Sequence, residues 1–109
     1  MHDAHPIFLE ALHSKHRLSV CFFHKKEGVE VTRVCAPLDY GPLRGAKHVA
    51  DVYQLWDLEA KRKPYNLAVA PDDVRSLKAL PDTFDLTSII TWTFKPHAWH
   101  IKRDWGDFS

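Results

Sequence analysis

The chain has 109 residues, which is enough for one hydrophobic core but not for two. Its 45% hydrophobic and 27% charged residues are typical of a globular domain and exclude a disordered chain. Fifteen Lys and Arg residues balance fourteen Asp and Glu residues, so no whole-molecule field attracts nucleic acid or an anionic membrane. Binding of a polyanion would therefore need a local cluster of basic side chains.

The sequence predicts neither a targeting segment nor a membrane segment. Residues 1–6 lack a basic start followed by an apolar stretch, and no apolar run approaches the roughly 20 residues that span a bilayer. We therefore expect a cytoplasmic protein with no membrane segment.

The N-terminal residues predict a helix. Apolar side chains recur at helical spacing between Pro6 and His16, and Pro6 suits a first helical turn. The helix is assigned to residues 5–16.

A hairpin is predicted next, with a strand over 18–23, a turn over 25–28 and a second strand over 29–37. This turn places Cys21 opposite a residue near Thr32 rather than opposite Cys35. The two cysteines are thus expected to stay unpaired, as small apolar residues in a reducing compartment.

The rest of the chain predicts more strands and one uncertain extension. Breaker residues, β-branched runs and alternation indicate a loop over 38–45, a second hairpin with strands over 48–58 and 65–69, a turn at 71–73 and a short strand over 74–80. A helix followed by five short strands predicts a mainly β fold, a small antiparallel barrel over 18–80 with a C-terminal extension over 82–109, in one domain. Within the extension, residues 87–94 fit either a strand or a short helix.

These elements, in this order, resemble a WYL domain. Residues 31–37, Val-Thr-Arg-Val-Cys-Ala-Pro, carry an Arg and a Pro where the second strand of that family has them. The aromatic strand over 52–59 resembles the strand that names the family, and residues 65–80 resemble the strands that close its barrel. The resemblance covers residues 6–80. It implies an Sm-like or SH3-like β-barrel and a regulatory domain that binds nucleic acid or a small ligand, often in transcriptional regulation.

Arg33 is the first candidate binding residue. A guanidinium on a barrel strand presents a rigid fork of donors that suits a phosphate, a carboxylate or a base edge. The resemblance points to the same residue. The alternative is an exposed strand residue that pairs with a neighbouring carboxylate.

Aromatic residues form the second candidate group. Tyr53, Trp56 and Tyr65 could make a stacking surface beside Arg33 for single-stranded bases or planar ligands. Tyr53 and Trp56 are three residues apart and face opposite sides of a regular strand, so one of them is expected to fill the core.

Basic residues cluster at two predicted hairpin tips. Lys61, Arg62 and Lys63 lie at the second tip, and Lys25 and Lys26 at the first. A nucleic-acid backbone could lie along this charge, and the neutral chain favours a single strand over a duplex. The alternative is that these are solvated turn positions.

Catalytic and metal-binding motifs are missing from the sequence. Three pairs among its eight histidines have a spacing of three, but no Cys pair at metal spacing accompanies them, so neither a metal nor a cofactor is expected. The chain also lacks Gly-x-Ser-x-Gly and a Gly-rich phosphate loop. We therefore expect a protein that binds rather than catalyses.

The C-terminal run over 92–105 interleaves aromatic and basic side chains. This pattern fits contacts with single-stranded nucleic acid, but also a tail that packs over the barrel or against a second subunit, and packing is favoured. Open barrel edges favour a homodimer. The leading hypothesis is a regulatory module for nucleic acid or a small anionic ligand. The alternative is an interaction or dimerisation module without a small ligand.

Overall fold

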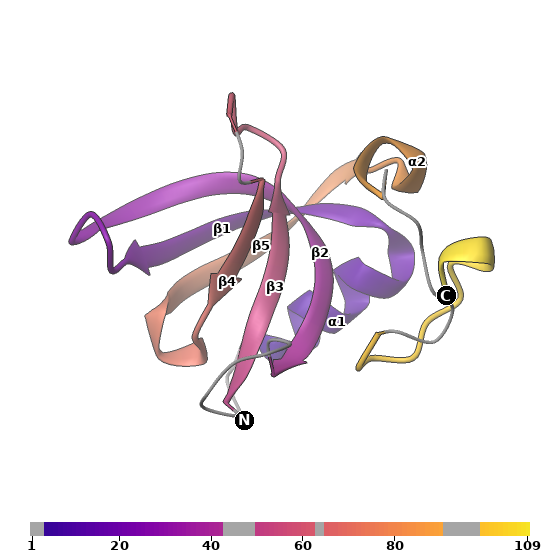
Figure 1. Cartoon of the computed structure of the whole chain (residues 1–109), viewed down its shortest axis with the longest axis horizontal. Coiled ribbons are helices and arrows are strands. Elements are labelled where there is room, and N and C mark those ends of the chain that lie inside the picture. The colour runs from indigo at the N-terminus through magenta and orange to yellow at the C-terminus, as the bar shows by residue number, and fades with distance from the viewer. Residues whose placement is uncertain (1–3, 43–49, 63–64, 91–98) are drawn as a thin grey trace.

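The computed structural model describes residues 4–42, 50–62, 65–90 and 99–109. These residues form an N-terminal helix, one curved sheet and several short helical turns (Figure 1). In chain order the elements are α1 (His5–Ser14), β1 (His16–His24), β2 (Val29–Pro42), β3 (Asp51–Asp57), β4 (Asn66–Val69), η1 (Pro71–Asp73), β5 (Val74–Thr83), α2 (Leu86–Ile89) and η2 (Gly106–Phe108). The mainly β fold with an N-terminal helix is confirmed.

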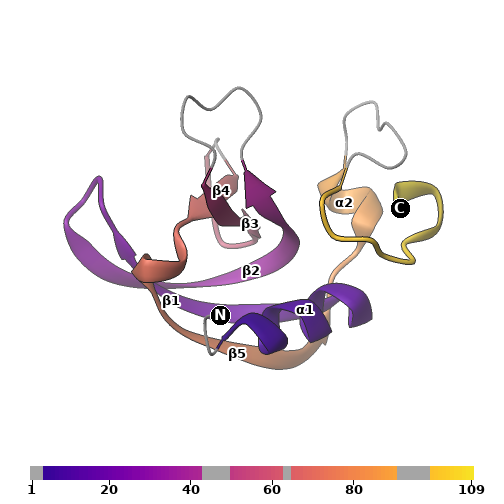
Figure 2. The ribbon, with the colours of Figure 1, turned by 90° about the horizontal axis from the view of Figure 1, so that it is seen from below.

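The five strands form one antiparallel sheet in the order β4-β3-β2-β1-β5. A closed barrel would also need pairing between the two edge strands, β4 and β5. No such ladder joins them in the described part of the chain. The sheet bends strongly, as Figure 2 shows, but it stays open. The predicted barrel is therefore not closed.

Helix α1 packs against the sheet through Phe8, Ala11 and Leu12, whose spacing places them on one helical face. Pro6 stands in the first turn, where its missing N–H leaves no hydrogen bond unmade. The helix ends two residues earlier than predicted, because Lys15 adopts a left-handed conformation with φ of 58° and caps the last turn.

The first hairpin has the predicted register. Cys21 lies opposite Thr32, whereas Cys35 lies opposite Leu18, and both cysteines are free. Gly28, with φ of 69°, supplies the left-handed residue that the turn needs. The strands are longer than predicted, since β1 extends from His16 to His24.

Strand β2 continues through residues 38–42, where a loop was predicted. Pairing with β3 resumes at Asp39 after a register shift, and it runs on to Pro42 opposite Asp51. The shift is a bulge at Leu38, which lets the strand bend and continue despite its breaker residues. The loop prediction is therefore wrong for residues 38–42, and residues 43–45 lie outside the described residues.

The last strand and the extension also differ from prediction. β5 passes through Pro81 and ends at Thr83, three residues beyond the predicted end. Because β5 is an edge strand, a proline there can turn the side that lacks an N–H away from the ladder. Residues 86–89 form a short helix capped by Asp85, one of the two predicted options for this stretch. Residues 91–94 are not described.

Residues 99–109, here called the C-terminal segment, pack beside α2 and the end of α1 (Figures 1 and 2). Trp105 is 3% exposed, and its Nε1 donates to the carbonyl of Leu12 at 3.0 Å. The indole N–H of Trp99 donates to the carbonyl of Phe108 at 2.7 Å. For these residues the tail does pack over its own sheet and helix, as the favoured interpretation expected.

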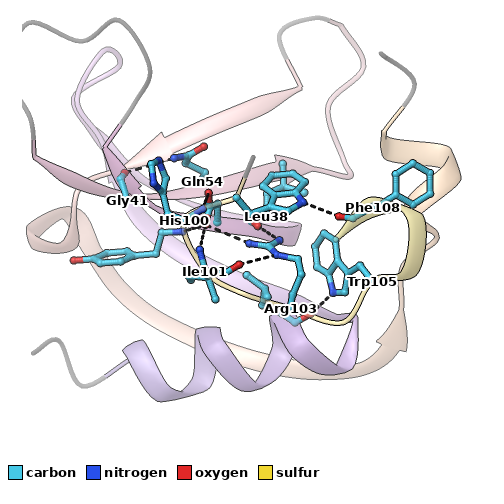
Figure 3. A network of polar contacts seen from close by, with 12 residues as sticks. Leu38, Gly41, Gln54, His100, Ile101, Arg103, Trp105 and Phe108 are labelled. Atoms are coloured by element: carbon cyan, nitrogen blue, oxygen red, sulfur yellow. Dashed lines mark hydrogen bonds and ion pairs between the residues drawn. The ribbon is translucent and has the colours of Figure 1, made fainter. Parts of the chain in front are cut away.

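A buried ion pair fixes the C-terminal segment to β2 (Figure 3). The guanidinium of Arg103 lies 4.3 and 4.4 Å from the ring centres of Trp99 and Trp105, and its side chain is fully buried. It pairs with Asp39 Oδ1 at 3.2 Å and donates to the carbonyl of Leu38. The bulge thus presents both a carboxylate and a carbonyl to one arginine.

The Asp39 carboxylate also accepts backbone hydrogen bonds. The N–H groups of His100 and Ile101 donate to it at 2.9 and 3.0 Å, and that of Tyr40 donates at 2.9 Å. Four donors thus satisfy one buried carboxylate, which burial without partners would penalise heavily. Asp39 and Arg103 are the main polar link between the sheet and the C-terminal segment.

Candidate ligand-binding groove

The concave face of the sheet, here called the inner face, carries Val20, Arg33 and Cys35. Val20 and Arg33 lie directly opposite each other, and cross-strand partners share a face. Cys35 follows two residues later on β2 and lies opposite Asp57 of β3. Val20 and Cys35 are fully buried, whereas the side chain of Arg33 is 48% exposed. The inner face is thus buried in its middle and exposed to solvent toward the hairpin tips.

Helix α1 covers the other end of the inner face. The ring centre of Phe8 lies 4.8 Å from that of Tyr53, and Tyr53 lies on β3 with Leu55 and Asp57 at alternate positions. Tyr53 is 1% exposed, and its hydroxyl lies 2.9 Å from Nδ1 of His5. Burial, followed by the nearby Tyr40, raises the pKa of Tyr53 to about 12. Tyr53 is therefore the member of the Tyr53–Trp56 pair that fills the core.

The open end of the inner face forms a groove of about 880 Å³ between the β1–β2 hairpin and the turn after β3. Small-molecule sites typically have volumes of roughly 300–1,000 Å³. Two apolar side chains and four cations that line it matter for binding: Phe22, Leu67, Lys26, Arg33, Lys61 and Arg62. Three of the predicted site residues, Arg33, Lys61 and Arg62, thus line one cavity although they come from different strands and turns.

Two of the three carboxylates in the groove are engaged by neighbouring groups. Asp57 Oδ2 lies 3.8 Å from Arg33 Nε, and its Oδ1 accepts from the N–H of Glu59 at 2.9 Å. The Glu59 carboxylate in turn accepts from the N–H of Val34 at 2.6 Å. Glu27 is the third carboxylate of the lining. In the described chain, no carboxylate pairs with Lys26, Lys61 or Arg62.

Arg33 matches the structural alternative given for it, and its binding role stays a prediction. It is an exposed strand residue paired with a carboxylate, since Nε faces Asp57. Its two terminal nitrogens have no partner among the described residues and lie at a groove wall. Asp57 therefore steadies the guanidinium from one side and leaves its two terminal nitrogens for a ligand, the arrangement that bidentate recognition of an anion needs.

The predicted stacking surface lies away from these cations. Trp56 neighbours Asp57 on β3, so its side chain points to the opposite face of the sheet. Its ring centre lies 5.4 Å from that of Tyr65, with the planes tilted by 33°. Trp56 lines a separate pocket of about 350 Å³ with Trp99. The expectation that Trp56 and Tyr65 stand beside Arg33 is therefore wrong, and Lys63 lies outside the described residues.

Sequence reasoning overlooked the inward carboxylate Asp57. A signal was available, because Tyr53, Leu55 and Asp57 alternate along one strand and the first two are core residues. A carboxylate at the third inward position implies a cationic partner, and Arg33 is that partner. Lys25 was grouped with the basic tip, but it pairs with Asp73 at 3.1 Å.

The thiol of Cys35 lies near this groove but stays protonated at neutral pH. Burial raises its pKa to about 12, with further contributions from the charges of Asp57 and Glu59. A buried, protonated thiol is a poor nucleophile. Among the residues that the structure describes, no three His, Cys, Asp or Glu side chains are arranged to hold a metal ion. No helix in the same residues is long and apolar enough to cross a bilayer.

Comparisons with protein-family models, with curated proteins and with solved structures found no match to this chain.

Proposed function

We propose that this protein is a non-enzymatic binding module that takes a small anionic ligand in the groove at the open end of its sheet. The observation that carries this proposal is the convergence of Arg33, Lys61 and Arg62 on one groove, which Phe22 and Leu67 also line. Lys61 and Arg62 have no carboxylate partner among the described residues, and although Glu27, Asp57 and Glu59 also line the groove, its four cations leave a formal excess of one positive charge. The steadied fork of Arg33 supplies direction.

A regulatory role rests on the resemblance to WYL domains. The order of elements supports it, because a helix is followed by two hairpins and a last strand that returns to β1. An Sm-like architecture in which β4 and β5 remain apart is the fold that this proposal implies. Arg33, the residue to which the resemblance points, lies in the groove.

Nucleic acid is the less favoured ligand. A single strand binds by stacking its bases on aromatic rings while cations follow its backbone. Here the Trp56–Tyr65 pair is on the face opposite to Arg33. Dimerisation through the aromatic tail is likewise less favoured, because Trp99 and Trp105 pack on their own chain.

Chemical-shift mapping tests the proposal. Inorganic pyrophosphate and a short oligothymidylate would each be titrated into labelled protein at low and at high salt. We expect pyrophosphate to shift the amides around Phe22, Arg33 and Lys61 in a saturable way, and Arg33→Gln to abolish the shifts. Lys78→Gln is the matched control, because Lys78 is exposed on β5 and outside the groove. Absence of any saturable shift in the groove at low salt would refute the proposal.

A further inference from the structure

Strand β4 is an edge of the sheet, and its pairing with β3 determines which of its backbone groups face that edge. The N–H of Asp57 donates to the carbonyl of Tyr65 at 2.6 Å. In an antiparallel ladder, every second pair of residues is hydrogen-bonded. The next hydrogen-bonded residues of β4 are therefore Leu67 and Val69. These residues direct their N–H and C=O groups toward β3.

Asn66 and Ala68 direct the same groups outward, to the free edge of β4. Both residues are exposed, and no backbone hydrogen bond joins either of them to another segment in the described part of the chain. The other edge strand, β5, carries Arg75, Lys78 and Pro81, residue types that oppose edge-to-edge pairing. Strand β4 has no charged residue and no proline. It is therefore the edge at which a further strand can pair.

Both faces of the sheet are hollowed next to β4. The pocket of about 350 Å³ that Trp56 lines is here called the outer hollow. A hollow of about 220 Å³, here called the inner hollow, is lined by Phe22 and Val69. Leu67 and Ala68 line both hollows. A strand added at this edge would direct successive side chains to opposite faces, and thus to one hollow and then to the other.

The two hollows differ in charge. Among the described residues, none that lines the outer hollow is charged, and its polar side chains are the carboxamides of Gln54 and Asn66. The inner hollow is lined by Lys26 and by the Lys25–Asp73 ion pair, so with histidine neutral it has a formal excess of one positive charge. The outer hollow therefore suits an apolar side chain, and the inner hollow suits a carboxylate.

We propose that the free edge of β4 binds an extended peptide segment of a partner protein as an additional strand, with an apolar residue at the outer hollow and a neighbouring acidic residue at the inner hollow. The peptide backbone pairs with the outward N–H and C=O groups of Asn66 and Ala68, and its side chains give specificity. This interaction is separate from the proposed function, because neither Asn66 nor Ala68 lines the anion-binding groove.

A second copy of the chain is a less suitable occupant of this edge. Pairing of two β4 strands would bring Asn66–Val69 of one copy beside the same residues of the other. This segment contains no acidic residue, so it leaves the excess positive charge of each inner hollow without a partner. A partner segment that contains a carboxylate matches the edge better.

Hydrogen exchange measured by NMR tests the inference, with the end-blocked peptide Val-Glu-Phe-Glu-Val as the probe. We expect saturable binding that slows exchange of the Asn66 and Ala68 amides at least about tenfold at saturation. The same peptide with N-methylated amides keeps its side chains but loses its backbone donors, so it should not give this protection. Replacement of both Glu residues of the peptide by Lys should weaken binding roughly threefold or more.

A variant of the edge itself gives a second test. Ala68→Pro removes an outward N–H and leaves the bonds to β3 in place, since proline is tolerated at a sheet edge when the missing N–H faces solvent. We expect it to weaken the acidic peptide roughly three- to tenfold. Ala68→Ser is the matched control, because it keeps the N–H and should bind like the wild type. The N-methylated peptide makes the same comparison on unmodified protein if Ala68→Pro does not fold.

Four outcomes would overturn the inference. Equal binding of the N-methylated peptide would exclude strand addition, and equal binding of the Lys peptide would exclude the acidic partner. Protection of the Asn66 and Ala68 amides in the free protein that rises with protein concentration would identify a second copy as the occupant. Failure of the acidic peptide to bind would also overturn it, whereas the pyrophosphate titration of the groove would still decide the proposed function.

Discussion

At the scale of single residues, the best-satisfied charge of the molecule is structural and the candidate ligand-binding charge is not. Arg103 has a carboxylate, two carbonyls and two indole rings around its guanidinium. Arg33 has one carboxylate at 3.8 Å and is half exposed. A fully satisfied buried arginine has nothing left to offer a ligand, whereas Arg33 keeps two donors. This difference separates a residue that holds the fold from one that is available for binding.

Replacement of Asp39 should be severe. Burial lowers the pKa of Arg103 to about 10, and Asp39 opposes that shift, so the guanidinium remains charged at neutral pH. Asp39→Ala leaves this charge buried without its partner, and we expect the free energy of unfolding to fall by roughly 3–5 kcal/mol. Urea denaturation followed by circular dichroism measures the loss.

The control for this variant is Asp72→Ala, because Asp72 is exposed and should change the same free energy by less than about 0.5 kcal/mol. The double variant Asp39→Ala with Arg103→Met removes both charges, and we expect it to recover part of the loss. An Asp39→Ala protein as stable as the wild type would show that the ion pair does not support the fold.

Residue-level prediction from the sequence succeeded where a local pattern existed. Alternation along β1 and the turn at Gly28 fixed the register of Cys21 opposite Thr32. Arg33 and the basic tips were visible as cations on predicted strands and turns. The Asp39–Arg103 pair was not, because the two residues lie 64 positions apart and neither has a local signal for the other. Only the folded chain brings them together.

At the scale of elements, the contact between β2 and the C-terminal segment depends on Gly41. A Cβ atom at this position would lie 2.5 Å from Cδ2 of the His100 ring and 2.9 Å from its Cβ. The His100 Nε2 also donates to the carbonyl of Pro42 at 3.1 Å. The strand can therefore accept this ring only where it carries a glycine.

Gly41→Ala should destabilise the protein by about 1–3 kcal/mol, because the ring and the strand cannot both keep their positions. The same substitution in a His100→Ala background should cost clearly less, since the contact with the ring at 2.5 Å is gone and only the contact with the Cβ of residue 100 at 2.9 Å remains. Urea denaturation of the four proteins gives this coupling directly. Additive effects of the two substitutions would contradict the proposed clash.

A pH dependence is expected at the start of α2. The side chain of Asp85 accepts from the hydroxyl of Thr87 at 2.8 Å and from its N–H at 3.0 Å. These two hydrogen bonds lower the pKa of Asp85 below its ordinary value of 3.8. A carboxyl with a lowered pKa stabilises the folded state above pH 3.8, and the contribution disappears as the pH falls through the folded-state pKa.

The variant Asp85→Asn isolates this charge, because asparagine keeps an acceptor for the helix cap. We expect the wild type to have the higher urea midpoint at neutral pH. The difference should shrink as the pH falls below 3.8 and disappear below the lowered folded-state pKa, where the wild-type carboxyl is neutral. A difference that is independent of pH would show that the charge of Asp85 has no part in capping.

Predicted elements failed where long-range packing outweighs local propensity. Residues 38–42 contain breakers and were assigned to a loop, yet a bulge and the C-terminal segment hold them in β2. Pro81 was taken as a strand end, but its position at a sheet edge lets β5 continue. The two hairpins and the helix were predictable because their periodicity is local.

At the scale of the whole molecule, the inner face of the open sheet has two ends with different roles. Helix α1 fills one end, and the opposite end remains as the cationic groove. The C-terminal segment joins the filled end by packing Trp105 against α1 and Phe84. Stability is thus concentrated away from the groove, so the groove can carry exposed charge without disrupting the core.

This division predicts that the C-terminal segment unfolds together with the sheet. In a background with Trp56→Phe and Trp92→Phe, the fluorescence of Trp99 and Trp105 reports on the segment, while far-UV circular dichroism reports mainly on the strands and α1. Because Trp105 is 3% exposed and donates to α1, we expect both signals to change at the same urea concentration. Trp105→Ala should lower the free energy of unfolding by about 3–5 kcal/mol and move both transitions together. A fluorescence transition at lower urea than the loss of strand signal would contradict this, since the segment would then detach from a sheet that remains folded.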